Sequence, residues 1–358
     1  MNARNAVPEM KPTRQPDFEN LLAVLRRECP PRPVLFEFSI CEQHLRRCVE
    51  EAGRTWRESG SPEDIVSNQI EGFRAAGYDF ATFPLWAADL MRFDSATRDR
   101  LASVGLAHGG VITDRESFER FSWPDPEAGD CGIFERIAPR VPEGMKLVLY
   151  GPKGVLENLV ALVGYEELCY LIADDRDLVR DIADAIGSRL LRFYERCLAH
   201  DVFGAAFVND DWGFKTQLFL SPPDLREFVF PWHRKIVAAI HARGMPAILH
   251  SCGLMEAVWE NIIEDLRFDG KHSYEDTIQP VEDVYERFAG RLAILGGMDM
   301  DFLCRQPADH VERRCRAMLE LASERGGYAL GSGNSIPDYV PWESFAALRR
   351  TALDARSQ

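Results

Sequence analysis

The chain has 358 residues, of which 46% are hydrophobic, so it can bury a large core as one α/β barrel or as two ordinary domains. Its 57 acidic and 42 basic residues give a net charge of −15, which argues against general binding to nucleic acid or to an anionic membrane. No apolar stretch approaches the roughly 18 residues of a transmembrane helix.

The nine cysteines are scattered and form no Cys-x-x-Cys pair, a pattern typical of a reducing compartment rather than of a disulfide framework. Residues 1–17 are polar, contain prolines and lack the apolar core of a signal peptide. We therefore expect a cytoplasmic protein with a flexible N-terminal arm over residues 1–17, followed by a single domain over residues 18–358.

Short runs rich in β-branched and aromatic residues alternate with longer helical patterns. Eight runs cover residues 34–39, 78–83, 146–150, 205–209, 245–249, 267–271, 292–296 and 328–331, and the sixth is the weakest. After the first run, Ser61 as N-cap, Pro62 at the first position and Gly77 at the end predict a helix. Apolar residues recur every three or four positions over 177–200, which predicts a helix with a buried face.

Eight such units predict a (β/α)8 TIM barrel, whereas a doubly wound sheet ordinarily needs fewer strands. Residues 106–142 interrupt the alternation because they show no clear helical period and contain Gly109-Gly110 and Trp123-Pro124. We interpret this segment as an insertion after the second βα unit, either a hairpin or a lid. The predicted fold is therefore an α/β barrel with a short N-terminal extension and one insertion.

Polar residues follow nearly every run, at the strand ends where the active sites of barrel enzymes lie. The catalytic candidates are Asp210, Asp211 and His272. The candidates for contact with a small-molecule substrate are Glu37, Trp86, Tyr150, Asn209, Lys215, Lys271, Glu275, Asp299 and Asn334. Several of these residues could instead have a structural role, because residues such as Asp211, Asp299 and Asn334 commonly cap the next helix. Lys271 and His272 could likewise belong to a solvated charge cluster.

The tripeptide His250-Ser251-Cys252 ends the fifth run and carries two soft metal ligands. In an extended backbone, residues i and i+2 point to the same side, so the imidazole and the thiol can converge on one ion. The competing interpretation is that Cys252 is a small buried hydrophobic residue, the usual state of cysteine.

These strand ends resemble those of the uroporphyrinogen decarboxylase superfamily, which includes zinc-dependent methyltransferases that act with methylcobamide and coenzyme M. The resemblance extends from about Pro33 to Phe345 and implies a (β/α)8 barrel. It is strongest in four motifs, namely Ser221-Pro222, His250-Ser251-Cys252-Gly253, Gly296-Gly297-Met298-Asp299 and Gly331-Ser332-Gly333-Asn334. Many members are dimers, and the acidic surface is compatible with a homodimer or with a monomer.

In the methyltransferase branch, the resemblance implies zinc ligands from His-x-Cys and from a later Cys after the last strand. His250 and Cys252 match the first two ligands, but Ser332 stands at the third position, and a neutral hydroxyl is a poor zinc ligand. Either a carboxylate or a histidine completes the site, or no tight metal is held. The candidates for the missing ligand are Asp211, His272, Glu275 and Glu37.

The decarboxylase branch implies metal-free chemistry on a tetrapyrrole with eight carboxylates, which an arginine-rich loop after the first strand receives. Here that loop, residues 39–44, is neutral to acidic, and Arg46 and Arg47 follow on a helical spacing. Burial of substrate carboxylates beside Glu37 and Glu42 would cost several kcal/mol without compensating cations. The sequence therefore disfavours uroporphyrinogen as the substrate.

The leading hypothesis is a zinc-dependent, corrinoid-linked methyltransferase or demethylase of a small methylated compound or thiol. A partner protein would supply the corrinoid, since the resemblance covers no corrinoid-binding domain in this chain. One alternative is a decarboxylase acting on a small carboxylate, in which Lys215 or Lys271 holds the carboxylate and Asp210 or His272 handles protons. The other is a non-catalytic barrel that binds a metal or a corrinoid.

Overall fold

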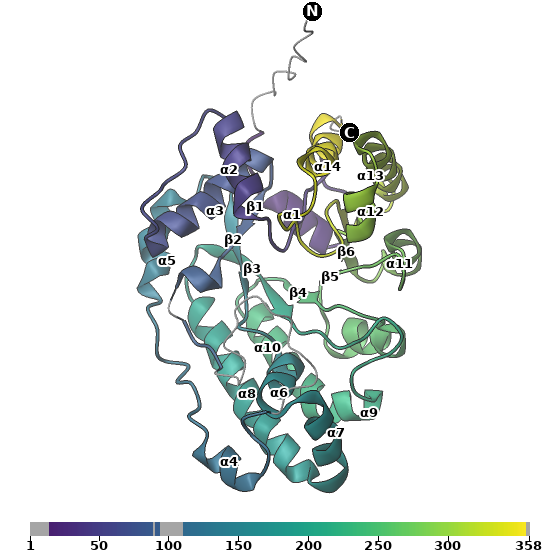
Figure 1. Ribbon diagram of the computed structural model, residues 1–358. Coiled ribbons are helices and arrows are strands. Elements are labelled where there is room, and N and C mark those ends of the chain that lie inside the picture. The colour runs from purple at the N-terminus through teal and green to yellow at the C-terminus, as the bar shows by residue number, and fades with distance from the viewer. Residues whose placement is uncertain (1–13, 89, 94–109, 356–358) are drawn as a thin grey trace, which may run out of the picture.

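A parallel, curled β-sheet lies at the centre of the fold, and helices surround it (Figure 1). The computed structural model describes residues 14–88, 90–93 and 110–355. Seven strands pair in chain order, each parallel to the next. They are β1 (Phe80–Thr82), β2 (Lys146–Tyr150), β3 (Phe203–Asn209), β4 (Ala247–His250), β5 (Gly270–His272), β6 (Ala293–Leu295) and β7 (Tyr328–Ala329).

The first predicted run, residues 34–39, lies beside the last strand and forms a single parallel bridge between Leu35 and Leu330. The Phe36 N–H donates to the Leu330 carbonyl at 2.8 Å, and the Leu330 N–H donates to the Val34 carbonyl at 2.8 Å. Within the described chain, no backbone hydrogen bond joins this run to β1. The rings of Phe36 and Phe80 approach to 5.3 Å, so side chains pack across that gap.

Fourteen α-helices cover the described chain. They are α1 (Glu19–Leu25), α2 (Glu42–Glu51), α3 (Pro62–Ala76), α4 (Arg115–Arg120), α5 (Gly132–Ile137), α6 (Val155–Val163), α7 (Tyr165–Asp174), α8 (Arg176–Cys197), α9 (Pro222–Asp224), α10 (Phe230–His241), α11 (Val281–Phe288), α12 (Met300–Arg305), α13 (Ala308–Ala322) and α14 (Trp342–Asp354). Short 3₁₀ or π turns are η1 (Leu85–Ala87), η2 (Ala138–Arg140), η3 (Leu225–Val229), η4 (Glu256–Val258) and η5 (Asn261–Asp265). None of the described helices is both long and apolar enough to span a bilayer.

The two helices predicted from local signals are confirmed. The Ser61 side chain accepts the Asp64 N–H at the start of α3, and Gly77 ends that helix with a φ of 96°. Because this φ lies in the left-handed region, glycine is the residue that tolerates it best. Helix α8 buries Leu178, Ile182 and other apolar residues of the predicted stripe.

The predicted insertion lies between β1 and β2. Over residues 110–142 it contains α4, α5 and η2 and forms no strand, so the hairpin interpretation is wrong for that part. Residues 106–109 of the insertion lie outside the described residues, as do residues 1–13 of the predicted N-terminal arm. The Arg14 guanidinium donates to the Pro33 carbonyl at 2.9 Å, which ties the chain to the fold from that point onward.

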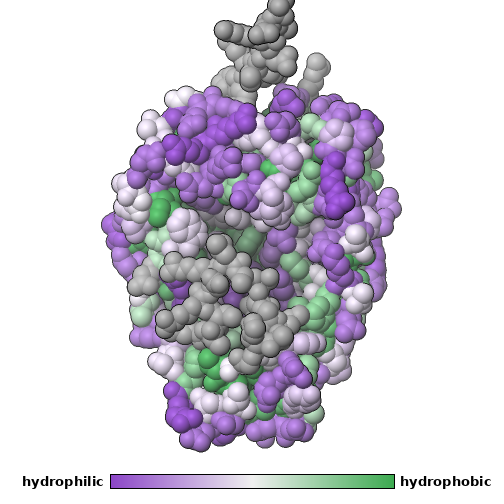
Figure 2. Space-filling model, viewed as in Figure 1, coloured by the Kyte–Doolittle hydropathy of each residue, from purple (hydrophilic) through white to green (hydrophobic). Residues whose placement is uncertain are grey.

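Aromatic side chains fill the interior beneath the strand ends. The Phe36 ring lies 5.5 Å from Phe207 and 5.3 Å from the imidazole of His272. Above this layer the register pairs Asn209 with His250 and His250 with His272, so three polar residues meet at adjacent strand ends. The surface facing the viewer in Figure 2 is largely hydrophilic around its rim, in keeping with the high charge.

Candidate metal centre

Asp211, His250 and Cys252 converge at the carboxyl ends of β3 and β4, with His250 as the last residue of β4. One potential ligand atom from each of the three lies within 4.8 Å of the other two. The Cys252 N–H donates to the Asp211 carboxylate at 2.8 Å, which fixes one loop against the other. The structure therefore joins the predicted His-x-Cys pair to one of the four residues proposed as the third ligand.

A close backbone contact also holds these two loops together. Gly253 has a φ of 93°, and a Cβ atom there would lie 2.2 Å from the Gly213 carbonyl oxygen. The next residue, Leu254, donates its N–H to the Phe214 carbonyl at 2.9 Å. Only glycine satisfies both the backbone angle and the lack of space at position 253.

The Cys252 sulfur has two polar neighbours. Ser273 places its hydroxyl 3.2 Å from Sγ, and the Asn334 amide donates to Sγ at 3.4 Å. Burial, with Asp211 adding to it, raises the pKa of the Cys252 thiol to about 12. Without a metal the sulfur is thus a thiol at neutral pH, and the two neighbours are placed to stabilise a thiolate once a cation displaces the proton.

His250 and His272 form a hydrogen-bonded pair, with their Nδ1 atoms 2.8 Å apart. The His272 Nε2 atom faces the Ser332 carbonyl at 3.3 Å, and a carbonyl only accepts. Burial lowers the pKa of both rings, to about 4 for His250, so both are neutral. It follows that His272 donates from Nε2 and accepts at Nδ1, that His250 donates from Nδ1, and that the His250 Nε2 lone pair is left for a metal.

Phe38 covers the His250 imidazole. The two rings are stacked with centroids 4.3 Å apart and planes inclined by 20°. Phe38 itself is half-buried and lies edge-on to Phe207 at 5.0 Å. The stacking restrains rotation of the imidazole and leaves part of an aromatic face at the edge of the site.

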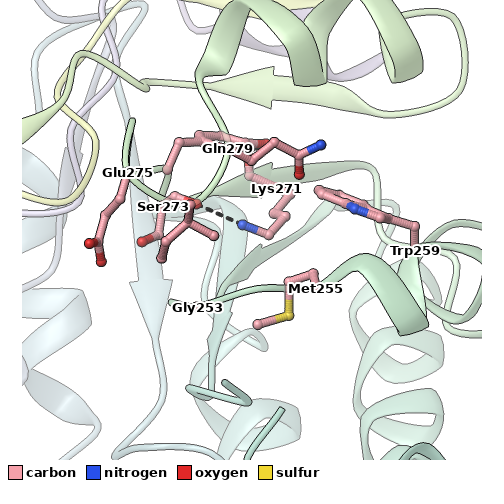
Figure 3. A pocket seen from close by; sticks show the side chains of 9 residues that line it. Gly253, Met255, Trp259, Lys271, Ser273, Glu275 and Gln279 are labelled. Atoms are coloured by element: carbon pink, nitrogen blue, oxygen red, sulfur yellow. Dashed lines mark hydrogen bonds between the residues drawn. The ribbon is translucent and has the colours of Figure 1, made fainter. Parts of the chain in front are cut away.

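Lys271 is buried beneath the site, where its ammonium is held by backbone carbonyls. Its ammonium donates to the Ser251, His272 and Ser273 carbonyls at 3.2, 3.4 and 2.7 Å. Figure 3 shows it reaching toward Ser273 in a pocket that Met255 and Trp259 also line. Burial lowers its pKa to about 8. Lys271 therefore connects the segment that carries His250 and Cys252 to the end of β5, which carries Ser273.

Glu37 and Ser332 are both fully buried and contact each other. The Ser332 N–H donates to one Glu37 oxygen at 2.7 Å, and the Ser332 hydroxyl donates to the other. Burial raises the pKa of Glu37 to about 8 in spite of these bonds. Glu37 therefore points inward, and it engages the Ser332 hydroxyl.

Asp210, although adjacent to Asp211, is completely enclosed by protein. Its carboxylate accepts the N–H groups of Leu156 and Glu157 at the start of α6, at 3.0 and 2.9 Å. It also accepts the Trp212 indole N–H at 3.0 Å and lies 2.7 Å from His233 Nε2. These contacts give Asp210 the function of an anchor for α6 and α10.

Most of the other residues predicted to contact substrate make contacts within the protein. Asn209 accepts the Gly151 N–H at 3.0 Å, and the Tyr150 hydroxyl accepts the Leu85 N–H at 3.2 Å. Asp299 caps α12 and accepts the Asp276 N–H at 2.9 Å. The Lys215 ammonium lies 3.3 Å from a Glu275 carboxylate oxygen, and this ion pair joins the loop after β3 to the loop after β5. Trp86 is 62% exposed in η1.

Sequence reasoning missed three residues of the site. Phe38 and Ser273 each follow residues that it selected, and alternation along the chain could have indicated Phe38. Ser273 has a φ of 86°, a conformation that only the structure reveals. Glu157 lies among carboxylates, and burial together with Asp211 and Asp210 raises its pKa well above the usual value.

Comparison with known proteins gives consistent results. The chain is 24% identical over 250 residues to a uroporphyrinogen decarboxylase from Geobacillus kaustophilus (strain HTA426), covering 66% of this chain and 68% of that protein. It is 30% identical over 132 residues to the enzyme of the same name from Sorangium cellulosum (strain So ce56), covering 36% of each.

A solved methyltransferase from Methanosarcina mazei shares the fold. It superposes with a TM-score of 0.71 at 17% identity, over 94% of this chain and 97% of that one. Residues 140–354, more than half of the chain, match the family described as uroporphyrinogen decarboxylase (URO-D). By this match, and by the strand-end motifs that it includes, the chain belongs to the uroporphyrinogen decarboxylase family.

Proposed function

We propose that this chain is a zinc-dependent methyltransferase or demethylase built on a (β/α)8 barrel, which exchanges a methyl group between a small molecule and a corrinoid carried by a partner protein. The observation that carries the proposal is the cluster of Asp211, His250 and Cys252, whose ligand atoms lie within 4.8 Å of one another. The shared fold with the Methanosarcina methyltransferase supports it.

The donor set suits zinc. One nitrogen, one sulfur and one carboxylate oxygen are ligand types that zinc accepts, and three protein ligands leave a fourth position for substrate, as in catalytic zinc sites. Bound there, zinc would supply Lewis acidity that holds a thiol substrate as its thiolate or polarises a methoxy or amine leaving group. In this proposal Asp211 provides the anionic ligand for which Ser332 is unsuited.

The surrounding side chains would hold and orient these ligands. His272 keeps the His250 Nε2 lone pair free, and Ser273 and Asn334 are positioned to stabilise the Cys252 thiolate. The half-buried Phe38 ring over His250 offers an apolar surface on which a methyl group can rest. We assign substrate contact first to Phe38 and Asn334 because they adjoin the ligands directly.

Decarboxylation is the second candidate, favoured by the names of the two curated relatives. The two arginines of α2, which follow residues 34–39, are already engaged. Arg46 pairs with Glu50 and Glu58, and Arg47 pairs with Glu51 and lies 4.2 Å from the Trp342 ring centroid. A substrate with many carboxylates would therefore find few free cations there, which makes methyl transfer the better proposal.

Elemental analysis of the full chain tests the metal, and a transfer assay tests the reaction. We expect about one zinc per chain, lost in Cys252→Ala and retained in Cys169→Ala, whose cysteine is exposed elsewhere. Demethylation of free methylcobalamin by small thiols, followed by the corrinoid absorbance, should require Cys252. Zinc binding without transfer to any thiol or from any methylated compound would favour a binding barrel, and turnover of uroporphyrinogen would favour the decarboxylase.

A further inference from the structure

A second cavity, with a volume of about 320 Å³, lies at the opposite end of the sheet from the candidate metal centre. Phe268 and Asp269, which directly precede β5, line it together with His241, the last residue of α10. The carboxyl end of β5 carries His272, which belongs to the metal centre. Because the active sites of barrel enzymes lie at the carboxyl ends of the strands, this cavity lies outside the catalytic face.

Two arginines in the wall of this cavity have no carboxylate partner. Arg27 and Arg267 are both exposed, and neither forms an ion pair with a residue that the structure describes. The Arg27 guanidinium donates to the Leu25 carbonyl at 3.4 Å, which is long for a hydrogen bond. The Arg267 guanidinium makes no hydrogen bond within the described chain. Both guanidinium groups are therefore available to a ligand.

The two carboxylates of the cavity are already engaged. Glu264 accepts from Arg291 at 2.7 Å, and Asp269 lies 2.8 Å from the His241 Nε2 atom. Asp269 also accepts the Ala247 N–H at 2.8 Å. Three arginines and two carboxylates thus line the cavity, which makes its wall cationic in a chain whose net charge is −15. Such a local excess of positive charge favours an anionic ligand.

Arg27 and Arg267 also share a backbone conformation that favours glycine, with φ values of 64° and 61°. Arg27 follows α1, and the Glu28 N–H closes the end of that helix by donating to the Ala23 carbonyl at 2.9 Å. Arg267 follows η5 in a similar turn. Glycine is the usual residue at such helix ends because it has no Cβ atom. What arginine adds at both positions is therefore its side chain.

We propose that this cavity binds the phosphate group of a small molecule. The guanidinium groups of Arg27 and Arg267 donate N–H groups to the phosphate oxygens, an arrangement for which arginine is well suited. A phosphate monoester carries nearly two negative charges at neutral pH and so matches two unpaired cations, whereas one carboxylate matches one. Ile263 and Phe268 line the same cavity and offer an apolar surface to the rest of the ligand.

Calorimetric titration of the full chain with inorganic phosphate tests the proposal, at an ionic strength held constant with chloride. We expect saturable binding that is about tenfold weaker in Arg27→Gly and in Arg267→Gly. Since glycine tolerates the left-handed φ at both positions, both variants should fold as the parent chain does. Acetate, a monoanion, should not displace the phosphate.

Two further variants provide the controls. Arg243→Ala removes an exposed arginine that does not line the cavity, and it should bind phosphate as the parent chain does. Cys252→Ala should also bind it equally, because the metal centre lies at the other end of the strands. Equal affinity in both glycine variants would show that the two arginines serve only the ends of their helices, where a cation is favourable in itself. That result, loss of binding in Cys252→Ala, or the absence of saturable binding would overturn the proposal.

Discussion

Ser332 donates both its backbone N–H and its hydroxyl to the buried carboxyl group of Glu37. This is the position where the family resemblance places a third metal-binding cysteine. The hydroxyl is thus committed to an internal acid, whereas a carboxylate from a different strand end, Asp211, lies beside His250 and Cys252. Burial raises the pKa of Glu37 to about 8, although both hydrogen bonds from Ser332 act in the opposite direction.

Glu37 should make the stability of the fold fall as the pH rises. Its folded pKa is about 8, above the value near 4.3 of an exposed glutamate. Between these two values the folded state retains a proton that the unfolded state has released, so each unit of pH disfavours folding. Glu37→Gln keeps the acceptor and removes the proton. We expect this variant to gain stability relative to the parent chain at pH 8 but not at pH 4.5, in urea unfolding at both pH values.

Substitutions at Asp210 and Asp211 should have different effects, the first on the stability of the fold and the second on metal binding. Four groups contact the Asp210 carboxylate, and Asp210→Asn replaces one of its two acceptor oxygens with an NH₂ group. We expect this variant to lose about 2–4 kcal/mol in the free energy of unfolding, measured in urea. Asp211→Asn should leave unfolding nearly unchanged but should lower zinc affinity, measured by competition with a chromophoric chelator. Equal zinc affinity in Asp211→Asn and the parent chain would remove Asp211 from the ligand set.

His272 should act on the metal through His250. Its removal frees the His250 imidazole to rotate and to change tautomer, and loss of such a partner typically costs 10 to 100-fold in metal affinity. We expect His272→Ala to bind zinc about 10 to 100 times more weakly. In the metal-free protein, nitrogen NMR should show the proton of His250 on Nδ1 in the parent chain only. His241→Ala, which removes a distant histidine paired with Asp269, is the matched control.

Lys271 should be required for folding and for the arrangement of the site. Lys271→Met replaces the cation with an apolar side chain of similar length and removes the ammonium donor that three carbonyls share. We expect a loss of about 2–5 kcal/mol in the free energy of unfolding. Below the denaturation transition, the variant should also bind zinc more weakly, because the Ser251 and Ser273 carbonyls are no longer joined. Unchanged affinity would show that the backbone alone holds these loops.

Much of the fold could be predicted from the sequence because short apolar runs and capping signals are local. Seven of the eight predicted runs overlap the seven strands of the described chain, and the remaining one, residues 34–39, forms a bridge instead of a ladder. The weak run was predicted over residues 267–271, but β5 begins three residues later, at Gly270. Arg267 has a φ of 61°, which is incompatible with an extended strand. The helices within residues 110–142 are too short to show a period.

The site was harder to predict, because neighbouring residues of one type have opposite environments. Nothing in the pair Asp210-Asp211 distinguishes the buried anchor from the residue beside His250, since contacts from α6 and α10 make the difference. His250 and Cys252 could be paired because alternation along a strand is local. Their partners Ser273 and Asn334 come from other strand ends, 21 and 82 positions from Cys252.

Gly213 and Gly253 carry no functional group, yet their backbone contact places the Asp211 loop against the Cys252 loop. The spacing between the candidate ligands Asp211 and Cys252 is consequently set in part by this main-chain contact. A methyl side chain at position 253 would push the two loops apart. The candidate ligands Asp211 and Cys252 would then be further apart, although neither residue had changed. A homologue that keeps every ligand but lacks this glycine should therefore not be assumed to bind a metal.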